Sequence, residues 1–289
     1  MRFKKIAAAA LTAVMGFGLA ACGSTSGGTA SASGSSAATT AAAGATTTAA
    51  SGSASGSFTT AEKGVLHVAT NATFPPYEST TDDGGFTGID IDLANAIAEK
   101  LGLTVTIDNM DFGSIVAAVS GGKSDIGMAG MSVTDERKKS VDFTDTYANS
   151  KQVIIVTDDS DIKTPDDLSK AGKIGCQEGT TGYMLCSDTP ENGGYGEDHV
   201  IAYNNGIIAV QALLSGKVDA VVIDAEPAKE YVAANPGTKI LDTAFADEDY
   251  AICVSKNNPQ LRDAVNKALK ELKDDGTVKK TIDKYISAS

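Results

Sequence analysis

Two stretches of the chain, AVSGGKSD at residues 118–125 and ALLSGKVD at residues 212–219, follow the same pattern at an offset of 94 residues. In each, an apolar helical segment ends in small residues and a lysine, and an aspartate then opens an apolar run typical of a strand. Both copies stand in β-α-β context, in which neighbouring strands run parallel. The repeat therefore predicts an α/β protein with two similar lobes, each built on a mainly parallel sheet.

The segments before and within the first copy alternate between strand and helix. Residues 65–69 are a predicted strand, and residues 82–85 are a predicted turn between two short strands. Apolar side chains at helical spacing over residues 91–101 predict a helix. Ser114 is placed to cap a second helix over residues 115–119.

The chain is expected to pass between the lobes twice. Residues 151–156 are a predicted strand that leaves the first lobe, residues 245–254 lead back, and residues 258–274 and 277–286 have helical patterns. Two crossings would let the lobes hinge around a cleft. We therefore assign residues 58–150 and 247–289 to lobe 1, and residues 151–246 to lobe 2.

The N-terminus has the features of an export signal. Three basic residues precede a short uncharged apolar stretch, which predicts a signal peptide over residues 1–21 rather than a membrane span. The following LAAC tetrapeptide resembles the bacterial lipobox, so we expect Cys22 to carry the lipid. Residues 23–57 contain only Gly, Ser, Thr and Ala, which predicts a disordered tether over residues 22–57. An ordinary cleaved signal with an incidental cysteine is the alternative.

The net charge of the chain limits the kinds of binding partner. The net charge is −13, and loss of Arg2, Lys4 and Lys5 with the signal makes it −16. This acidity, without a basic patch or any Trp, argues against nucleic acid and anionic membrane as partners. We expect an extracytoplasmic body, held by lipid at the outer face of the cytoplasmic membrane or in the periplasm.

The cysteines and histidines leave one question open. Cys176 and Cys186 are ten residues apart and form either a disulfide or two buried thiols. The two histidines have no partners at metal-binding spacing, so no metal and no cofactor are expected.

Two charged residues suit the charged ends of a free amino acid. Arg137 follows a predicted strand, and its planar fork of donors matches a carboxylate. Asp224 ends another predicted strand, where ligands of parallel sheets bind, and suits an ammonium group. The plainer alternatives are a solvated charge within residues 135–139 for Arg137 and a helix cap for Asp224.

Further loop residues complete a candidate site. The EGTTG segment at residues 178–182, with Thr180 and Thr181, presents backbone donors and hydroxyl groups after a strand. Phe74 and Phe112 are aromatic residues in loops and are candidate walls of a binding site.

Three segments, NATFPPYE at residues 71–78, GIDIDL at 88–93 and MAGMSVTDER at 128–137, closely resemble the polar-amino-acid solute-binding proteins of ABC importers. The resemblance extends over residues 62–286. It implies a two-lobed flytrap fold. It also implies that the protein is a monomeric receptor and not an enzyme, and that it delivers a free amino acid to an ABC permease. It also implies a carboxylate clamp at Arg137, an ammonium-binding acid at Asp224 and an aromatic sandwich. By the same resemblance, Gly130, Ser132 and Thr181 help Arg137 to bind the carboxylate. Phe74 and Phe112 form the aromatic sandwich around the ligand.

One departure from the family bears on specificity. Where basic- and glutamine-binding members often have Asp, this chain has Asn71. Asn71 and Gln177 suit a polar uncharged side chain, which favours glutamine, cystine or a related amino acid. Two alternatives share the scaffold: an enzyme like the cyclohexadienyl dehydratases, and a receptor that docks on a sensor instead of a permease.

Overall fold

The structure, a computed structural model, describes residues 58–286. The expected signal peptide, the lipidated Cys22 and the tether lie outside these residues. The described part is an α/β fold with three sheets. None of its helices is long and apolar enough to cross a bilayer.

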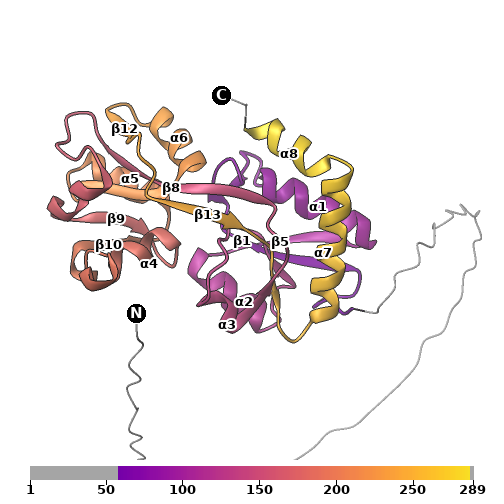
Figure 1. Cartoon of the computed structure of the whole chain (residues 1–289). Helices are drawn as coiled ribbons and strands as arrows, with labels where there is room; N and C mark the ends of the chain where they lie inside the picture. The colour runs from indigo at the N-terminus through magenta and orange to yellow at the C-terminus, as the bar shows by residue number, and fades with distance from the viewer. Residues whose placement is uncertain (1–57, 287–289) are drawn as a thin grey trace, which may run out of the picture. The chain divides into compact units, whose positions relative to one another are not determined.

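The first lobe is built on a sheet with the strand order β5-β1-β6-β14-β7. Figure 1 labels β1 and β5 of this sheet. Strands β5, β1 and β6 are parallel, whereas β14 runs antiparallel to both β6 and β7. Their bounds are β1 Val65–Thr70, β5 Thr104–Asn109, β6 Ile126–Gly127, β7 Val141–Phe143 and β14 Cys253–Ser255.

The second lobe is built on a sheet with the order β10-β9-β11-β8-β12, and β13 also pairs with β8. Strands β10, β9 and β11 are parallel, whereas β8 is antiparallel to all of its partners. Both sheets are thus more mixed than expected, because the strands that cross between lobes or return to one run against the repeated units. The bounds are β8 Ala148–Thr157, β9 Ile174–Gln177, β10 Val200–Tyr203, β11 Ala220–Asp224, β12 Thr238–Ile240 and β13 Ala246–Tyr250.

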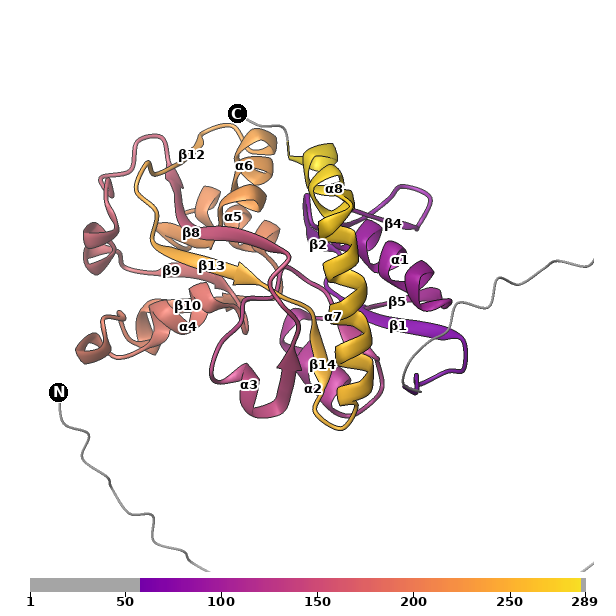
Figure 2. The same cartoon turned by 45° about the vertical axis from the view of Figure 1, so that its right-hand side comes forward.

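Helices cover both sheets, and a small third sheet lies beside the first lobe. Helices α7 and α8 from the C-terminal end pack against α1 (Figure 2). Helices α5 and α6 pack against the second sheet. The helices are α1 Ile89–Leu101, α2 Ile115–Ser120, α3 Arg137–Ser140, α4 Thr181–Ser187, α5 Gly206–Leu214, α6 Ala225–Ala234, α7 Pro259–Asp274 and α8 Thr277–Tyr285. The third sheet consists of β2 Thr73–Phe74, β3 Glu78–Thr80 and β4 Phe86–Thr87.

The internal repeat occupies the same place in both sheets. In the first copy α2 leads to β6, which lies beside β1; in the second copy α5 leads to β11, which lies beside β9. The aspartates of the two copies also have the same role. Asp125 accepts the backbone N–H of His67 in β1 at 2.8 Å, and Asp219 accepts that of Lys173 just before β9 at 3.1 Å. Each aspartate therefore anchors the start of the neighbouring strand.

Two strands connect the lobes. β8 and β13 run side by side between the two parts of the fold, paired from Gln152–Ala246 to Ala148–Tyr250 (Figures 1 and 2). The boundaries at residues 150/151 and 246/247 stay predictions.

Two helix starts differ from the prediction. Helix α1 begins at Ile89, two residues before the predicted start, and ends with Gly102 in the left-handed conformation at φ 71°. Ser114 precedes α2, but its side chain makes no capping hydrogen bond. The reason is that Ser114 itself belongs to a 3-10 turn, Phe112–Ser114, and already has helical backbone angles.

Gly127 offers a test of this packing. A Cβ atom at Gly127 in β6 would lie 2.5 Å from Sγ of Cys253 and 2.7 Å from Cγ2 of Ile115. We therefore expect Gly127→Ala to lower the free energy of unfolding by about 1–3 kcal/mol, as overpacking does. Urea denaturation followed by circular dichroism measures this. Gly113→Ala is the matched control, since nothing lies within 4 Å of its added Cβ. Equal stabilities for the two variants would contradict this packing.

Candidate functional site

All ten residues predicted to bind ligand line a single cavity between the lobes. They are Asn71, Phe74, Phe112, Gly130, Ser132, Arg137, Gln177, Thr180, Thr181 and Asp224, and Glu78 and Ala129 join them. The cavity has a volume of about 10 Å³, room for about one water molecule. A free amino acid therefore fits only when the lobes or the lining side chains move apart.

The site lies where parallel strands end. Asn71 follows β1, Gln177 ends β9 and Asp224 ends β11, while Gly130 and Ser132 follow β6. In parallel α/β sheets the carboxyl ends of the strands form one edge, and loops at that edge hold ligands. The two copies of the repeat thus bring the Arg137 loop and Asp224 to the same cavity from opposite lobes.

Arg137 is buried and contacts both lobes. It is 7% exposed, whereas the side chains of its neighbours Lys138 and Lys139 are 54% and 69% exposed. Its Nη1 donates to the Ser132 carbonyl at 2.6 Å, and its Nη2 donates to the Gly179 carbonyl in the other lobe at 2.9 Å. Burial lowers the pKa of Arg137, but an arginine stays protonated in proteins. It is thus a fixed cation at the site, not one member of a solvated charge run.

The Arg137 guanidinium also contacts an aromatic ring. Its Cζ atom lies 5.2 Å from the centre of the Phe112 ring, a cation–π distance. Gly179 lets the two lobes approach at this point, because a Cβ there would lie 3.2 Å from the Gly113 Cα atom, and its φ is +75°. These contacts fix the plane of the guanidinium over the cavity.

Asp224 is a buried acid and not a helix cap. It occupies the N-cap position of α6, yet its side chain makes no capping hydrogen bond. Its Oδ1 accepts the Tyr250 hydroxyl, and its Oδ2 accepts the Gln152 amide at 2.8 Å. Burial raises the pKa of Asp224 to about 7, against the opposing effect of the Tyr250 hydrogen bond. An ammonium group at this carboxylate would lower that pKa.

The polar and aromatic walls are also held in place. The Gln177 amide donates to Oδ1 of Asn71 at 2.9 Å across the cleft, and the Asn71 amide donates to the Met110 carbonyl at 2.8 Å. Phe74 packs over Gly130, where a Cβ would lie 2.8 Å from the ring. The Gly130 N–H donates to Asp90 at 2.9 Å and is therefore not free for a ligand. The role of this glycine is to let the Phe74 ring lie close to the backbone.

The threonines begin helix α4. Oγ1 of Thr180 accepts the Tyr183 N–H at 3.2 Å, as an N-cap does, and Oγ1 of Thr181 accepts from Gln152 at 3.2 Å. Both hydroxyl groups thus have protein partners, and the threonines line the cavity as a preformed helix start.

Four residues of this region escaped the sequence interpretation: Glu78, Ala129, Gln152 and Tyr250. Glu78 ends the 71–78 segment, which also contains the predicted site residues Asn71 and Phe74, so its place in that motif is a signal for the site. Gln152 and Tyr250 lie on the connecting strands β8 and β13. No pattern in the chain indicates that these strands turn polar side chains toward Asp224.

The predicted disulfide partners lie together in the core of the second lobe. Cys176 and Cys186 are both fully buried free thiols, and a hydrogen bond between them contributes most to the raised pKa of Cys176. The disulfide stays a prediction. Residues 58–286 contain no group of three or more His, Cys, Asp or Glu side chains arranged to hold a metal ion.

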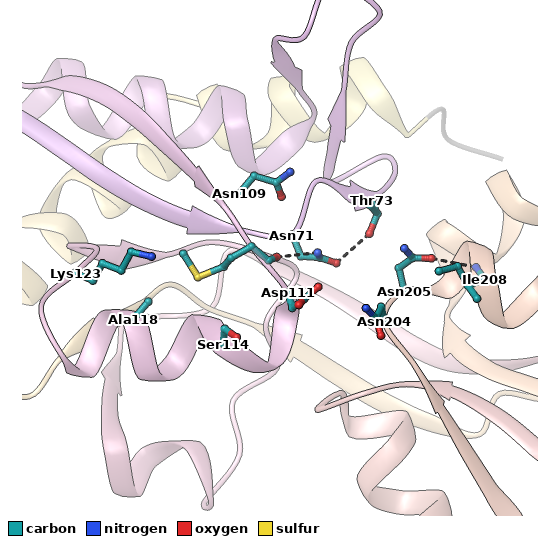
Figure 3. Close-up of a pocket in the computed structure, with 11 residues that line it drawn as sticks. Asn71, Thr73, Asn109, Asp111, Ser114, Ala118, Lys123, Asn204, Asn205 and Ile208 are labelled. Atoms are coloured by element: carbon teal, nitrogen blue, oxygen red, sulfur yellow. Dashed lines mark hydrogen bonds between the residues drawn. The ribbon is translucent and has the colours of Figure 1, made fainter.

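A wider groove opens beside the cavity. It has a volume of about 740 Å³ and shares Asn71 with the inner cavity. Figure 3 shows Asn71, Thr73 and Asp111 on one side of it and Asn204, Asn205 and Ile208 on the other. We call it the outer groove; its remaining lining residues are Asn109, Met110, Ser114, Ala118 and Lys123.

Two α/β lobes, two connecting strands, and a buried cation and acid facing one cavity define a binding protein for a small charged solute. The chain matches the bacterial extracellular solute-binding proteins, family 3, over residues 66–288. It belongs to this family, whose members serve ABC importers.

The relatives have names that state a ligand. The chain is 32% identical to a "Probable histidine-binding protein" of Neisseria gonorrhoeae, over 77% of the chain and 83% of that protein. It is also 32% identical to an "Arginine-binding extracellular protein" of Bacillus subtilis (strain 168), over 81% and 91%. Among solved structures, an ancestral arginine-binding protein bound to arginine is 43% identical, with a TM-score of 0.72, over 78% of this chain and 99% of that one. These relatives are named as binding proteins and not as enzymes, and this chain is likewise a binding protein.

Arg137→Ala tests the site. We expect binding of the amino acid ligand to weaken by about 2–5 kcal/mol, because the carboxylate then enters a desolvated cleft without its cation. Isothermal titration calorimetry measures the change. Lys138→Ala, which removes an exposed neighbouring charge, is the matched control and should bind as the wild type does. Unchanged affinity in Arg137→Ala would remove Arg137 from the site.

Proposed function

We propose that this protein is an extracytoplasmic receptor that binds a free polar amino acid between its lobes and delivers it to an ABC permease. The observation that carries the proposal is the pair of opposite buried charges, Arg137 and Asp224, which face one cavity from two lobes. A zwitterion supplies the complement of both. Buried charges are stable only when they are paired and hydrogen-bonded, so the ligand completes the site.

The proposed binding mode follows from donors and acceptors that remain available. The guanidinium of Arg137 has five N–H donors, and two of its nitrogens each make one bond to a carbonyl. The other donors are free for the ligand carboxylate. Asp224 takes the ammonium, and Phe74 and Phe112 enclose the ligand from the lobe 1 side.

The ligand side chain is proposed to point past Asn71 and Gln177. Since Asn71 lines both the inner cavity and the outer groove, a side chain that displaces the Gln177–Asn71 hydrogen bond reaches open space. An amide such as that of glutamine suits these two residues, and cystine has the length to enter the groove.

Arginine is the second candidate ligand, and a specific observation favours it. Asp111 and Glu178 line a further cavity of about 230 Å³ that shares Phe112 with the binding site. Two carboxylates in the lining of this further cavity suit a guanidinium, and relatives are named for arginine. The ancestral arginine-binding protein also has a structure bound to glutamine, at 42% identity and a TM-score of 0.71.

A thermal-shift screen tests the proposal. Ligand-stripped protein is heated with each free amino acid and with cystine at millimolar concentration. A micromolar ligand should stabilise the protein by about 4 kcal/mol, because ligand that binds only the folded state shifts the unfolding equilibrium. Among glutamine, cystine and arginine, the amino acid that raises the melting temperature most identifies the ligand side chain that the site prefers. If no amino acid raises the melting temperature, the proposed function is wrong.

We further propose that Cys22 is lipidated and that residues 22–57 tether the body to the membrane. The LAAC segment and the Gly, Ser, Thr and Ala run support this. Cells that express the full chain with a labelled fatty acid should incorporate label into the wild type, and Cys22→Ala should abolish it. The substitution leaves residues 58–286 unchanged, so amino acid binding by the variant protein should equal that of the wild type and is the control. Equal labelling of both forms would contradict the anchor.

A further inference from the structure

Glu78 is an acid of the binding cavity to which no role has yet been assigned. It begins strand β3 and pairs with Phe74 of β2. Its side chain is 0% exposed and lines the same cavity as Asp224 and Arg137. The position is therefore inside the proposed ligand site and not on its rim.

Neither carboxyl oxygen of Glu78 has a hydrogen-bond partner among residues 58–286. The carboxyl group of Asp90 lies beside it. Oδ2 of Asp90 accepts the Gly130 N–H at 2.9 Å and the Tyr147 hydroxyl at 2.8 Å, while its Oδ1 is unpartnered. Two adjacent buried carboxyl groups do not both ionise unless a cation lies beside them. Glu78 therefore holds a proton, which it can donate to Oδ1 of Asp90.

The surroundings of Glu78 are acidic or neutral. Burial and then Asp90 raise its pKa well above the ordinary value, and Asp224 adds to the effect. Burial raises the pKa of Asp90 only to about 6, because the Gly130 and Tyr147 hydrogen bonds favour its charged form. Two acids face Glu78, Asp90 of α1 and Asp224 at the end of β11. Three tyrosines also face it: Tyr77 just before β3, Tyr147 just before β8, and Tyr231 of α6. Arg137 also lines this cavity, but burial and the neighbouring acids are what raise the pKa of Glu78.

Asp224 alone leaves an ammonium group incompletely bound. Each of its oxygens already accepts one hydrogen bond, from Tyr250 and from Gln152. An ammonium group has three donors to satisfy in a closed cavity. Glu78 lines the same cavity, and neither of its carboxyl oxygens has a hydrogen-bond partner among residues 58–286.

We propose that Glu78 is a second ammonium-binding acid, and that the proton it shares with Asp90 leaves for solvent when the ligand ammonium enters. This assignment rests on the proposed function. Before binding, the Glu78–Asp90 pair carries one negative charge; afterwards it carries two, and the ammonium supplies the compensating positive charge. Affinity then rises with pH as long as the ammonium stays protonated, because binding releases a proton.

Calorimetric titration of Glu78→Gln tests the assignment. Glutamine, arginine, histidine and cystine are each titrated at about pH 7 in phosphate and in Tris, whose ionisation heats differ. The difference in heat gives the number of protons released. For the best ligand we expect Glu78→Gln to release about one proton fewer than the wild type. Its affinity should fall about tenfold or more at about pH 8, and less at about pH 6, where wild-type Glu78 keeps more of its proton.

Glu99→Gln is the matched control, since Glu99 is an exposed acid on α1. It should release as many protons as the wild type and bind with the same affinity. If Glu78→Gln also matches the wild type in both, the assignment is wrong while the proposed function stands. If the wild type binds none of the four ligands, the proposed function fails, and this assignment fails with it.

Infrared difference spectroscopy of the wild type provides a readout that does not need the variant to fold. At about pH 8 Asp224 is largely ionised, as its pKa is about 7, so a protonated carboxyl band belongs to the Glu78–Asp90 pair. We expect ligand to remove this band. A band that persists after saturation with ligand would overturn the assignment.

Discussion

The guanidinium of Arg137 donates to the Ser132 carbonyl in one lobe and to the Gly179 carbonyl in the other. A buried cation is tolerated only where hydrogen-bond acceptors and a compensating charge surround it. The approach of Gly179 to Gly113, the cation–π contact with Phe112 and the position of Asp224 all serve this need. The closed cleft is thus arranged around one fixed positive charge, which makes a ligand anion the natural third partner.

The connecting strands help to set the charge of the site. Tyr147, just before β8, donates to Asp90, and Tyr250, at the end of β13, donates to Asp224. The rings of these tyrosines lie 6.4 Å apart, and Tyr77 packs edge-on against Tyr250 at 5.1 Å. A hinge movement that displaces β8 or β13 therefore also alters the hydrogen bonds of the acids.

Much of the fold is readable from local patterns because its repeated unit is local. Helix, small-residue turn, aspartate and strand follow one another within residues 118–125 and again within 212–219, and the structure places both copies beside the first strand of a lobe. The antiparallel direction of strands β14 and β8 escaped prediction, since it depends on partners distant in sequence. Ser114 has the right residue type for a cap, but the preceding 3-10 turn gives it helical geometry.

The sequence by itself determined the two α/β lobes, and its family motifs indicated the ten residues that line the cavity. Most of these residues lie at or after the carboxyl ends of strands, which share an edge of the sheet. It also supplied the motifs that identify the family. Only the tertiary structure decided that Arg137 is buried while Lys138 is not, that Asp224 faces Tyr250 and not its own helix, and that the buried Glu78 lines the cavity without a hydrogen-bond partner among residues 58–286. Burial and contact across a cleft are properties of side chains from distant segments, and they arise only when the lobes come together.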